Sequence, residues 1–173
     1  NDLGVLGSFA RLGATSVTLT HSASRDWGDS STDAPRSRGL SPFGRDVIAE
    51  MNRLRMIVDL SHVSDPVIEQ VVELSTAPVI ASHSSAKAIC AHPRNLTDPL
   101  ARAIADTGGV VGVNFVNEII DQAYYDQVGK HGSVLAMLNQ PTRIPPDQLD
   151  RVAAERLRGW FQDDVARPPF ERV

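Results

Sequence analysis

The sequence has 173 residues, with 17 Lys or Arg against 21 Asp or Glu, which gives a formal net charge of −4 at neutral pH. This mildly acidic balance gives no support for binding to nucleic-acid phosphates or to an anionic membrane surface. No apolar run approaches the ~18 residues that predict a membrane-spanning helix.

The single cysteine, Cys90, cannot form a disulfide within the chain, which favours a reducing compartment such as the cytoplasm. The first residues, NDLGVLGSFARLG, contain neither an initiator Met nor a basic leader segment. We therefore expect the chain to be an internal piece of a longer protein.

Helical and strand patterns alternate along the first 115 residues. The strand segments are short runs rich in β-branched residues, as expected for strands buried on both faces. Three of the helical segments begin with Ser or Thr at the cap and a proline in the first turn. In chain order, the sequence predicts a helix ending at Leu12, a strand at 16–20, a helix after Ser41, a strand at 56–60, a helix after Ser64, a strand at 78–82, a helix after Thr97 and a strand at 110–115.

This alternation predicts an α/β fold with parallel strands and right-handed crossovers. Both a (β/α)8 barrel and an open doubly wound sheet have this pattern. No glycine-rich phosphate-binding turn follows a strand, which disfavours the nucleotide-binding open sheet. A complete barrel needs roughly 250 residues. Residues 1–173 are therefore expected to form about half of a TIM-like (β/α)8 barrel, as part of a single domain.

The last 58 residues lack this alternation. Residues 116–145 predict a long connection, which is either a lid-like loop over a site or a surface insertion. Residues 146–162 have the spacing of an amphipathic helix.

Three of the five histidines share one predicted position. His21, His62 and His83 each follow a predicted strand at its carboxyl end. Active sites of barrel enzymes form at that face, and neighbouring strands are ~4.8 Å apart, so these imidazoles can meet around one ion or substrate. Neutral imidazole is a frequent ligand of divalent metals. The alternative is a histidine that only satisfies local hydrogen bonds, and it suits one residue better than three.

Other polar side chains could also contribute to this face. His92 and His131 lie in predicted loops, where we expect them to be solvated. Arg94 follows His83 by eleven residues, in the loop after the same strand, and either holds an anionic substrate group or forms a surface ion pair. Asp59 alternates with His62 along its strand and is expected to point away from it, in a structural or supporting role.

Taken together, these segments resemble the membrane dipeptidase (renal dipeptidase) family of zinc peptidases, which are amidohydrolase-like. The resemblance runs from about Gly13 to Phe115. It is carried by LTHSASRDWGD, GLSPFGRDVIAEMNRLRMIVDLSHVS, APVIASHSSAKAICAHPRNLTD and VVGVNF.

The resemblance implies a distorted (β/α)8 barrel that binds two zinc ions and hydrolyses dipeptides. It implies that His62 and His83 ligate the same zinc, and that Arg94 binds the free carboxylate of the substrate. His21 would be catalytic and substrate-binding, because it would hold the scissile carbonyl in the tetrahedral intermediate. The family also uses an upstream His-x-Asp strand, a metal-bridging Glu and a later Asp base. This chain lacks all three, so we expect the piece alone to be inactive.

Two other functions are compatible with the sequence. The chain could belong to another amidohydrolase-type metal hydrolase that cleaves a small amide or lactam. It could instead belong to a catalytically dead homologue that serves as a binding or scaffold module. The presence or replacement of the three missing elements in the flanking sequence discriminates the enzyme from the scaffold. A homodimer is compatible with the sequence, which does not fix the oligomeric state.

Overall fold

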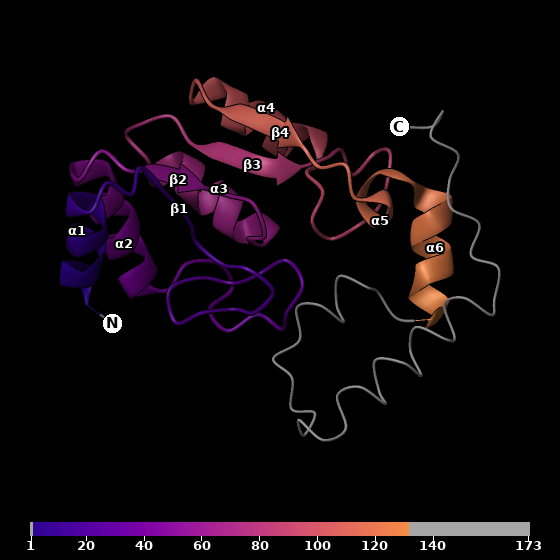
Figure 1. Ribbon diagram of the computed structural model, residues 1–173, viewed down its shortest axis with the longest axis horizontal. Helices are drawn as coiled ribbons and strands as arrows, with labels where there is room; N and C mark the ends of the chain where they lie inside the picture. The colour runs from indigo at the N-terminus through magenta and orange to yellow at the C-terminus, as the bar shows by residue number, and fades with distance from the viewer. Residues whose placement is uncertain (1, 132–173) are drawn as a thin grey trace, which may run out of the picture.

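In the computed structural model, described for residues 2–131, four strands form one parallel sheet (Figure 1). The strand order is β1-β2-β3-β4, so each strand pairs with its neighbour in the sequence. This order is what successive right-handed crossovers around a barrel produce. All four predicted strands are confirmed, although regular pairing starts or ends up to two residues from the predicted bounds. They are β1 (Ser16–Thr18), β2 (Ile57–Asp59), β3 (Ile80–Ser84) and β4 (Val110–Val113).

The helices between these strands begin where the sequence predicted. Ser41 Oγ accepts a hydrogen bond from the backbone N–H of Gly44, and Thr97 Oγ1 accepts one from Leu100. Ser64 also occupies an N-cap position, but without a side-chain hydrogen bond to the helix. The four helices before β4 are α1 (Leu3–Arg11), α2 (Pro42–Arg53), α3 (Asp65–Leu74) and α4 (Asp98–Asp106).

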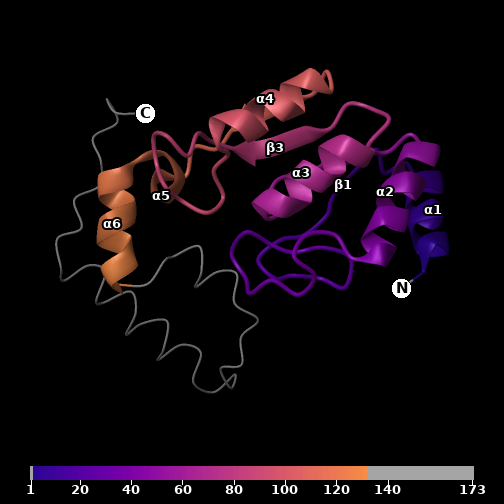
Figure 2. The same ribbon diagram turned by 180° about the vertical axis from the view of Figure 1, so that it is seen from behind.

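The hydrophobic core lies between the sheet and these helices. Each helix contacts the next, α1 on α2, α2 on α3 and α3 on α4, so they form a layer against the sheet (Figures 1 and 2). Val58 on β2, Met51 on α2 and Val71 on α3 are at most 1% exposed. Burial of side chains of this size contributes roughly 1.5–3 kcal/mol each.

The edge strand β4 leaves large apolar side chains uncovered within residues 2–131. Val110 and Val113 of β4 are 66% and 61% exposed, and Phe115, two residues after the strand, is 71% exposed. Open strand edges with exposed apolar residues are rarely left so in a finished fold. The sheet therefore resembles part of a closed barrel.

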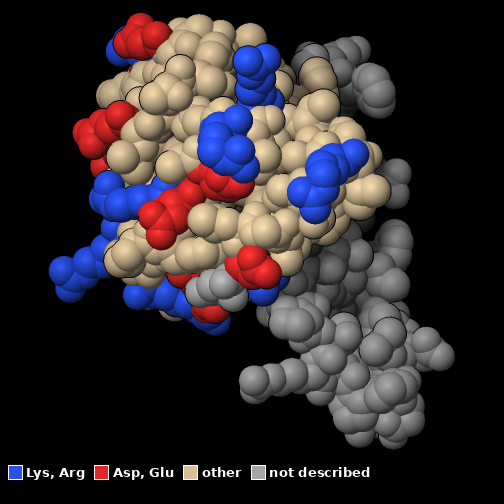
Figure 3. Space-filling view, turned by 90° about the vertical axis from the view of Figure 1, so that its left-hand side faces the viewer, with Lys and Arg blue, Asp and Glu red and all other residues tan. Residues whose placement is uncertain are grey.

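At the other end of the molecule, over α1 and α2, the surface is largely uncharged, with scattered positive and negative side chains (Figure 3).

The segment after β4 differs from the expected long loop, because it begins with two helices. These are α5 (Asn117–Ile120) and α6 (Gln122–His131). Ile119 of α5 is 1% exposed, and its carbonyl accepts a hydrogen bond from the side chain of Asn95, which fixes α5 against the loop after β3. Residues 132–145 and the predicted helix at 146–162 lie outside the described residues. None of the described helices is long and apolar enough to span a membrane.

A buried carboxylate organises the long loop between β1 and α2. Asp29 is 1% exposed, and its two oxygens accept hydrogen bonds from the backbone N–H groups of Arg36 (2.7 Å), Ser37 (3.1 Å) and Gly39 (2.8 Å). Its backbone carbonyl accepts from the N–H of Ser64 at the start of α3. Asp29 thus closes the loop on itself and ties it to the helix that follows β2.

We expect Asp29→Asn to destabilise the full-length protein by about 3 kcal/mol, since one charged acceptor of backbone N–H groups is replaced by a donor. Burial raises the pKa of Asp29, but the hydrogen bonds from backbone N–H groups together lower it by more. The pKa of Asp29 therefore lies below its usual value. The charged form therefore stabilises the fold above the unfolded pKa of ~3.9 and loses this effect as pH falls through the lower folded pKa. Chemical unfolding should show a constant difference between wild type and variant from about pH 7 to 5 and a shrinking one below about pH 4.

The matched control is Asp46→Asn, which removes the same charge from an exposed position on α2. It should change the free energy of unfolding by less than ~0.5 kcal/mol. An Asp29→Asn variant as stable as this control at neutral pH would contradict the role of Asp29 in the loop.

Candidate metal centre

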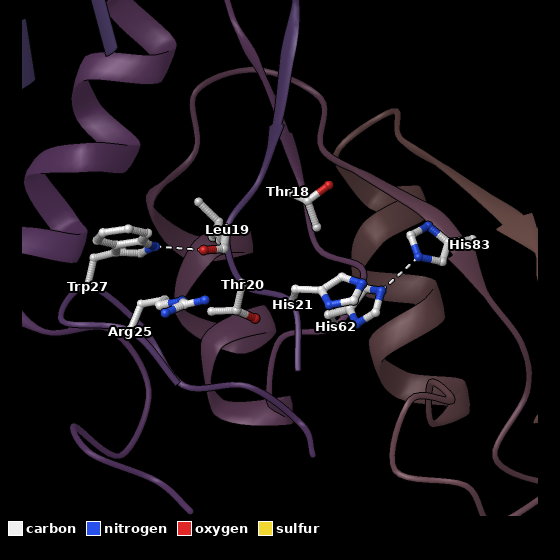
Figure 4. Close-up of a pocket in the computed structure, with 8 residues that line it drawn as sticks. All are labelled: Thr18, Leu19, Thr20, His21, Arg25, Trp27, His62 and His83. Carbon is white, nitrogen blue, oxygen red and sulfur yellow. Dashed lines mark hydrogen bonds between the residues drawn. The ribbon is translucent and has the colours of Figure 1, made fainter. Parts of the chain in front are cut away.

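Three histidines meet at the carboxyl ends of the parallel strands. The Nε2 atoms of His62 and His83 are 2.9 Å apart. The ring of His21 stacks on that of His62 with centroids 4.2 Å apart, and the rings of His62 and His83 are 4.9 Å apart (Figure 4). The strands that bear them are paired in register, Thr18 opposite Asp59 and Asp59 opposite Ile80. Residues just beyond these positions are therefore delivered to one place.

The backbone at His62 is held in an uncommon conformation. Its φ is +73°, which lies in the left-handed region that few residues other than glycine adopt. Its carbonyl accepts hydrogen bonds from the Ser31 N–H (2.8 Å) and from Ser30 Oγ (3.3 Å). Ser30 Oγ also lies 2.7 Å from the carbonyl of His21, so one hydroxyl in the β1–α2 loop bridges the ends of two strands. This loop is therefore part of the frame that orients His21 and His62.

A pocket of about 330 Å³ opens beside the histidines. Its volume is in the range of pockets that bind small ligands, ~300–1,000 Å³. Trp27 forms one wall and is fixed by a hydrogen bond from its Nε1 to the carbonyl of Leu19 (2.6 Å, Figure 4). The lining residues are Thr18, Leu19, Thr20, His21, Arg25, Trp27, His62 and His83.

Both facing imidazoles are neutral at physiological pH. Burial, reinforced by the charge of Arg94, lowers the pKa of His62 to about 3. The same two causes, in the same order, lower the pKa of His83. Metal ions bind the neutral form of imidazole, whose ring nitrogen has a free lone pair. The environment therefore favours the protonation state that a metal ligand requires.

Arg94 places a buried cation next to this pair. The residue is 8% exposed, and its Nη2 donates to the carbonyl of His83 (3.0 Å). Burial lowers its pKa to about 10, so the guanidinium remains charged at neutral pH. Within the part of the chain that the structure describes, Arg94 forms no ion pair and its Nε has no hydrogen-bond partner. Among these residues, the surface ion pair considered from the sequence is thus not formed.

His92 corrects a prediction, because it is buried rather than solvated. It is 7% exposed, its Nδ1 accepts a hydrogen bond from the Arg94 N–H (3.1 Å), and its ring lies 5.0 Å from that of Tyr125. Burial, followed by the charge of Arg94, lowers the pKa of His92 to about 4. Tyr125 belongs to α6, a helix that the sequence patterns did not predict at that position. The side chain of His131 is outside the described part.

Asn95 is a structural residue that sequence reasoning missed. It is 1% exposed, its Oδ1 accepts from the Ser85 N–H (3.1 Å), and its Nδ2 donates to the carbonyls of Cys90 and Ile119. These contacts fix the loop that presents Arg94 to the site. Asn95 directly follows Arg94 in the sequence, but no sequence pattern indicates which three backbone groups its side chain would bond.

The described residues fit part of a metal site. Two neutral imidazole nitrogens 2.9 Å apart either share one proton or face one cation. A protein zinc site generally has three or four protein ligands. Residues 2–131 contain no cluster of three or more His, Cys, Asp or Glu side chains suited to hold a metal. The pair thus offers two candidate nitrogen ligands, which is fewer than a complete zinc site needs.

Comparison with known proteins gives a consistent result. The family model described as membrane dipeptidase, peptidase family M19, matches residues 1–154. The chain is 45% identical over 154 residues to dipeptidase tcpJ of Claviceps purpurea, covering 86% of this chain and 35% of that protein. It is 38% identical over 131 residues to dipeptidase 3 of Mus musculus, covering 73% and 27% respectively. The chain thus spans about a third of the length of the curated relatives it matches.

Solved structures agree with this match. The probable dipeptidase PvdM from Pseudomonas aeruginosa superimposes with a TM-score of 0.73 at 30% identity, over 94% of this chain and 46% of that one. A metallo peptidase from Rhodobacter sphaeroides, solved with a phosphinate mimic of the dipeptide L-Ala-D-Ala, superimposes with a TM-score of 0.63 at 34% identity. That match covers 68% of this chain and 35% of the other.

Proposed function

The chain belongs to the membrane dipeptidase family, peptidase family M19, and from this premise we propose that the protein containing it is a zinc-dependent dipeptidase. The observation that carries the proposal is the facing pair of imidazoles, with Nε2 atoms 2.9 Å apart, beside the buried side chain of Arg94. The parallel α/β sheet is part of a TIM-like barrel, and the pair lies at the strand ends where barrel enzymes hold their reacting groups.

His62 and His83 would hold one zinc ion through their Nε2 atoms, and a second ion is proposed with ligands from outside this chain. Zinc supplies Lewis acidity, which polarises a carbonyl and lowers the pKa of water towards neutrality. The missing ligands and the general base are proposed to come from parts of the barrel that these residues do not include. Activity is accordingly proposed for the complete barrel and not for this piece.

His21 is the residue of this chain proposed to act on the scissile carbonyl. It is exposed, it stacks on His62, and it lines the same pocket as His62 and His83, the two proposed metal ligands. Ser22 Oγ lies 2.9 Å from its Nδ1, which leaves Nε2 for the substrate. A donor at this position stabilises the negative charge that develops on the carbonyl oxygen in the transition state.

Arg94 is proposed to select substrates with a free carboxyl terminus. A guanidinium pairs with a carboxylate through two parallel hydrogen bonds, and such pairs are stronger in a buried site than in water. Arg94 is charged and buried and forms no ion pair with another described residue, and an incoming carboxylate would supply one. A free carboxylate one residue from the cleaved bond is the feature that distinguishes a dipeptide from a longer peptide.

The test is to purify the full-length protein, load it with zinc, measure its metal content and assay a panel of L-L and L-D dipeptides. Hydrolysis of dipeptides, with amidated dipeptides and tripeptides as controls that react slowly, supports the proposal. Turnover of lactams or small cyclic amides without dipeptide hydrolysis would favour the other metal hydrolase. A protein that binds no zinc and cleaves none of these substrates would overturn the proposal in favour of a scaffold.

A further inference from the structure

Asp59 is a buried carboxylate with four donors around its two oxygens. The residue is 4% exposed. Its Oδ1 accepts from the backbone N–H groups of Ser61 (3.0 Å) and Ser82 (2.9 Å). Its Oδ2 accepts from two hydroxyls, Thr18 Oγ1 (2.7 Å) and Ser82 Oγ (2.6 Å). An ionised carboxylate can only accept hydrogen bonds, so both hydroxyls are donors in these contacts.

The hydroxyl of Ser82 has a second close neighbour. Its Oγ lies 2.7 Å from Nδ1 of His83. A hydroxyl carries one proton, and that of Ser82 is directed to Asp59. At His83 the Ser82 oxygen can therefore only accept, so Nδ1 of His83 must carry the proton. The other ring nitrogen, Nε2, then has a free lone pair, and it is the atom that faces His62.

We propose that Asp59 and Ser82 are positioning residues that fix His83 as the Nδ1–H tautomer and so prepare its Nε2 to bind a cation. The inference rests on the proposed role of His83 as a zinc ligand. Hydrogen-bonded partners behind a metal-binding histidine orient its ring and fix its tautomer, and their loss typically costs ~10–100-fold in metal affinity. Here the carboxylate acts through an intervening hydroxyl.

The geometry makes one isosteric change informative. In Asp59→Asn, the two backbone N–H groups at Oδ1 require the amide oxygen at that position, so the amide NH2 takes the place of Oδ2. The NH2 then donates to Ser82 Oγ, and the hydroxyl proton turns to its nearest remaining acceptor, Nδ1 of His83. The other oxygen within reach, Ser61 Oγ, is 3.4 Å away. His83 is thereby driven to the Nε2–H tautomer, which has no lone pair for the metal at that atom.

The experiment is NMR of the full-length protein with 15N-labelled histidine, in which long-range correlations distinguish the two tautomers, together with zinc titration against a competing chelator. Metal-free wild type should show His83 with the proton on Nδ1. Asp59→Asn should show it on Nε2 and bind zinc ~10–100-fold more weakly. Asp46→Asn is the matched control, because it makes the same chemical change at an exposed position on α2. It should keep the wild-type tautomer and zinc affinity.

The inference is overturned if His83 of the wild type carries its proton on Nε2, or if Asp59→Asn keeps both the wild-type tautomer and the wild-type zinc affinity. Ser82→Ala provides a second variant if Asp59→Asn does not fold. It should show a mixture of His83 tautomers and weaker zinc binding. A Ser82→Ala protein with the wild-type tautomer and zinc affinity would also overturn the inference. A wild-type protein that binds no zinc would refute the proposed function, while the tautomer measurement would still decide this inference.

Discussion

Replacing His83 with alanine in the full-length protein is expected to remove zinc and dipeptide hydrolysis together, and His62→Ala should do the same. The two Nε2 atoms face each other at 2.9 Å, so each variant deletes one of two nitrogens directed at a single point. Loss of a ligand should weaken zinc binding by more than the ~10–100-fold typical of losing a supporting residue. Metal analysis of the purified variants and steady-state rates on dipeptides measure both effects.

His92→Ala is the matched control for these variants. It also removes a buried imidazole at the same end of the sheet, but His92 packs against Tyr125 and not against the histidine pair. We expect it to reduce stability through the cavity it leaves while keeping the zinc content of wild type. A His83→Ala protein with full zinc content and activity would exclude His83 as a ligand, whatever its stability.

Local sequence signals predict much of this fold. Ser41 and Thr97 cap helices with the hydrogen bonds expected of their side chains, and short runs of β-branched residues mark each strand. The meeting of His21, His62 and His83 was also predictable, because parallel strands deliver residues beyond their carboxyl ends to one face. Periodicity and caps depend on neighbouring residues, so the sequence contains enough information to place them.

The parts of the site that could not be predicted depend on contacts between distant segments. Burial of His92 requires Tyr125, which is 33 residues later on a helix whose pattern was not recognised. Asn95 acquires its role from the carbonyls of Cys90 and Ile119, and Asp29 from a loop that folds back on it. The proton arrangement at His83 likewise follows from the distances between Ser82 and its two neighbours, which a sequence pattern does not specify.

Arg94→Met is expected to raise KM for dipeptides while leaving zinc in place. The guanidinium is buried and charged and forms no ion pair among the described residues, and it donates to the carbonyl of His83 rather than to a ring nitrogen. Removing one partner of a buried charge pair costs ~2–5 kcal/mol, which corresponds to a loss of at least about 30-fold in kcat/KM. For a dipeptide amidated at its carboxyl terminus the loss should be much smaller, since the anion that Arg94 would bind is already absent.

The comparison of the two substrates separates recognition from structural damage. A distorted active site would slow the free and the amidated dipeptide equally, whereas a lost carboxylate contact affects the free one alone. Arg102→Met, at an exposed position on α4, changes the net charge by the same amount and should leave both rates and the zinc content unaltered. Equal losses on both substrates in Arg94→Met would remove Arg94 from carboxylate recognition. It would then be a structural residue whose hydrogen bond to the His83 carbonyl holds the end of β3 in place.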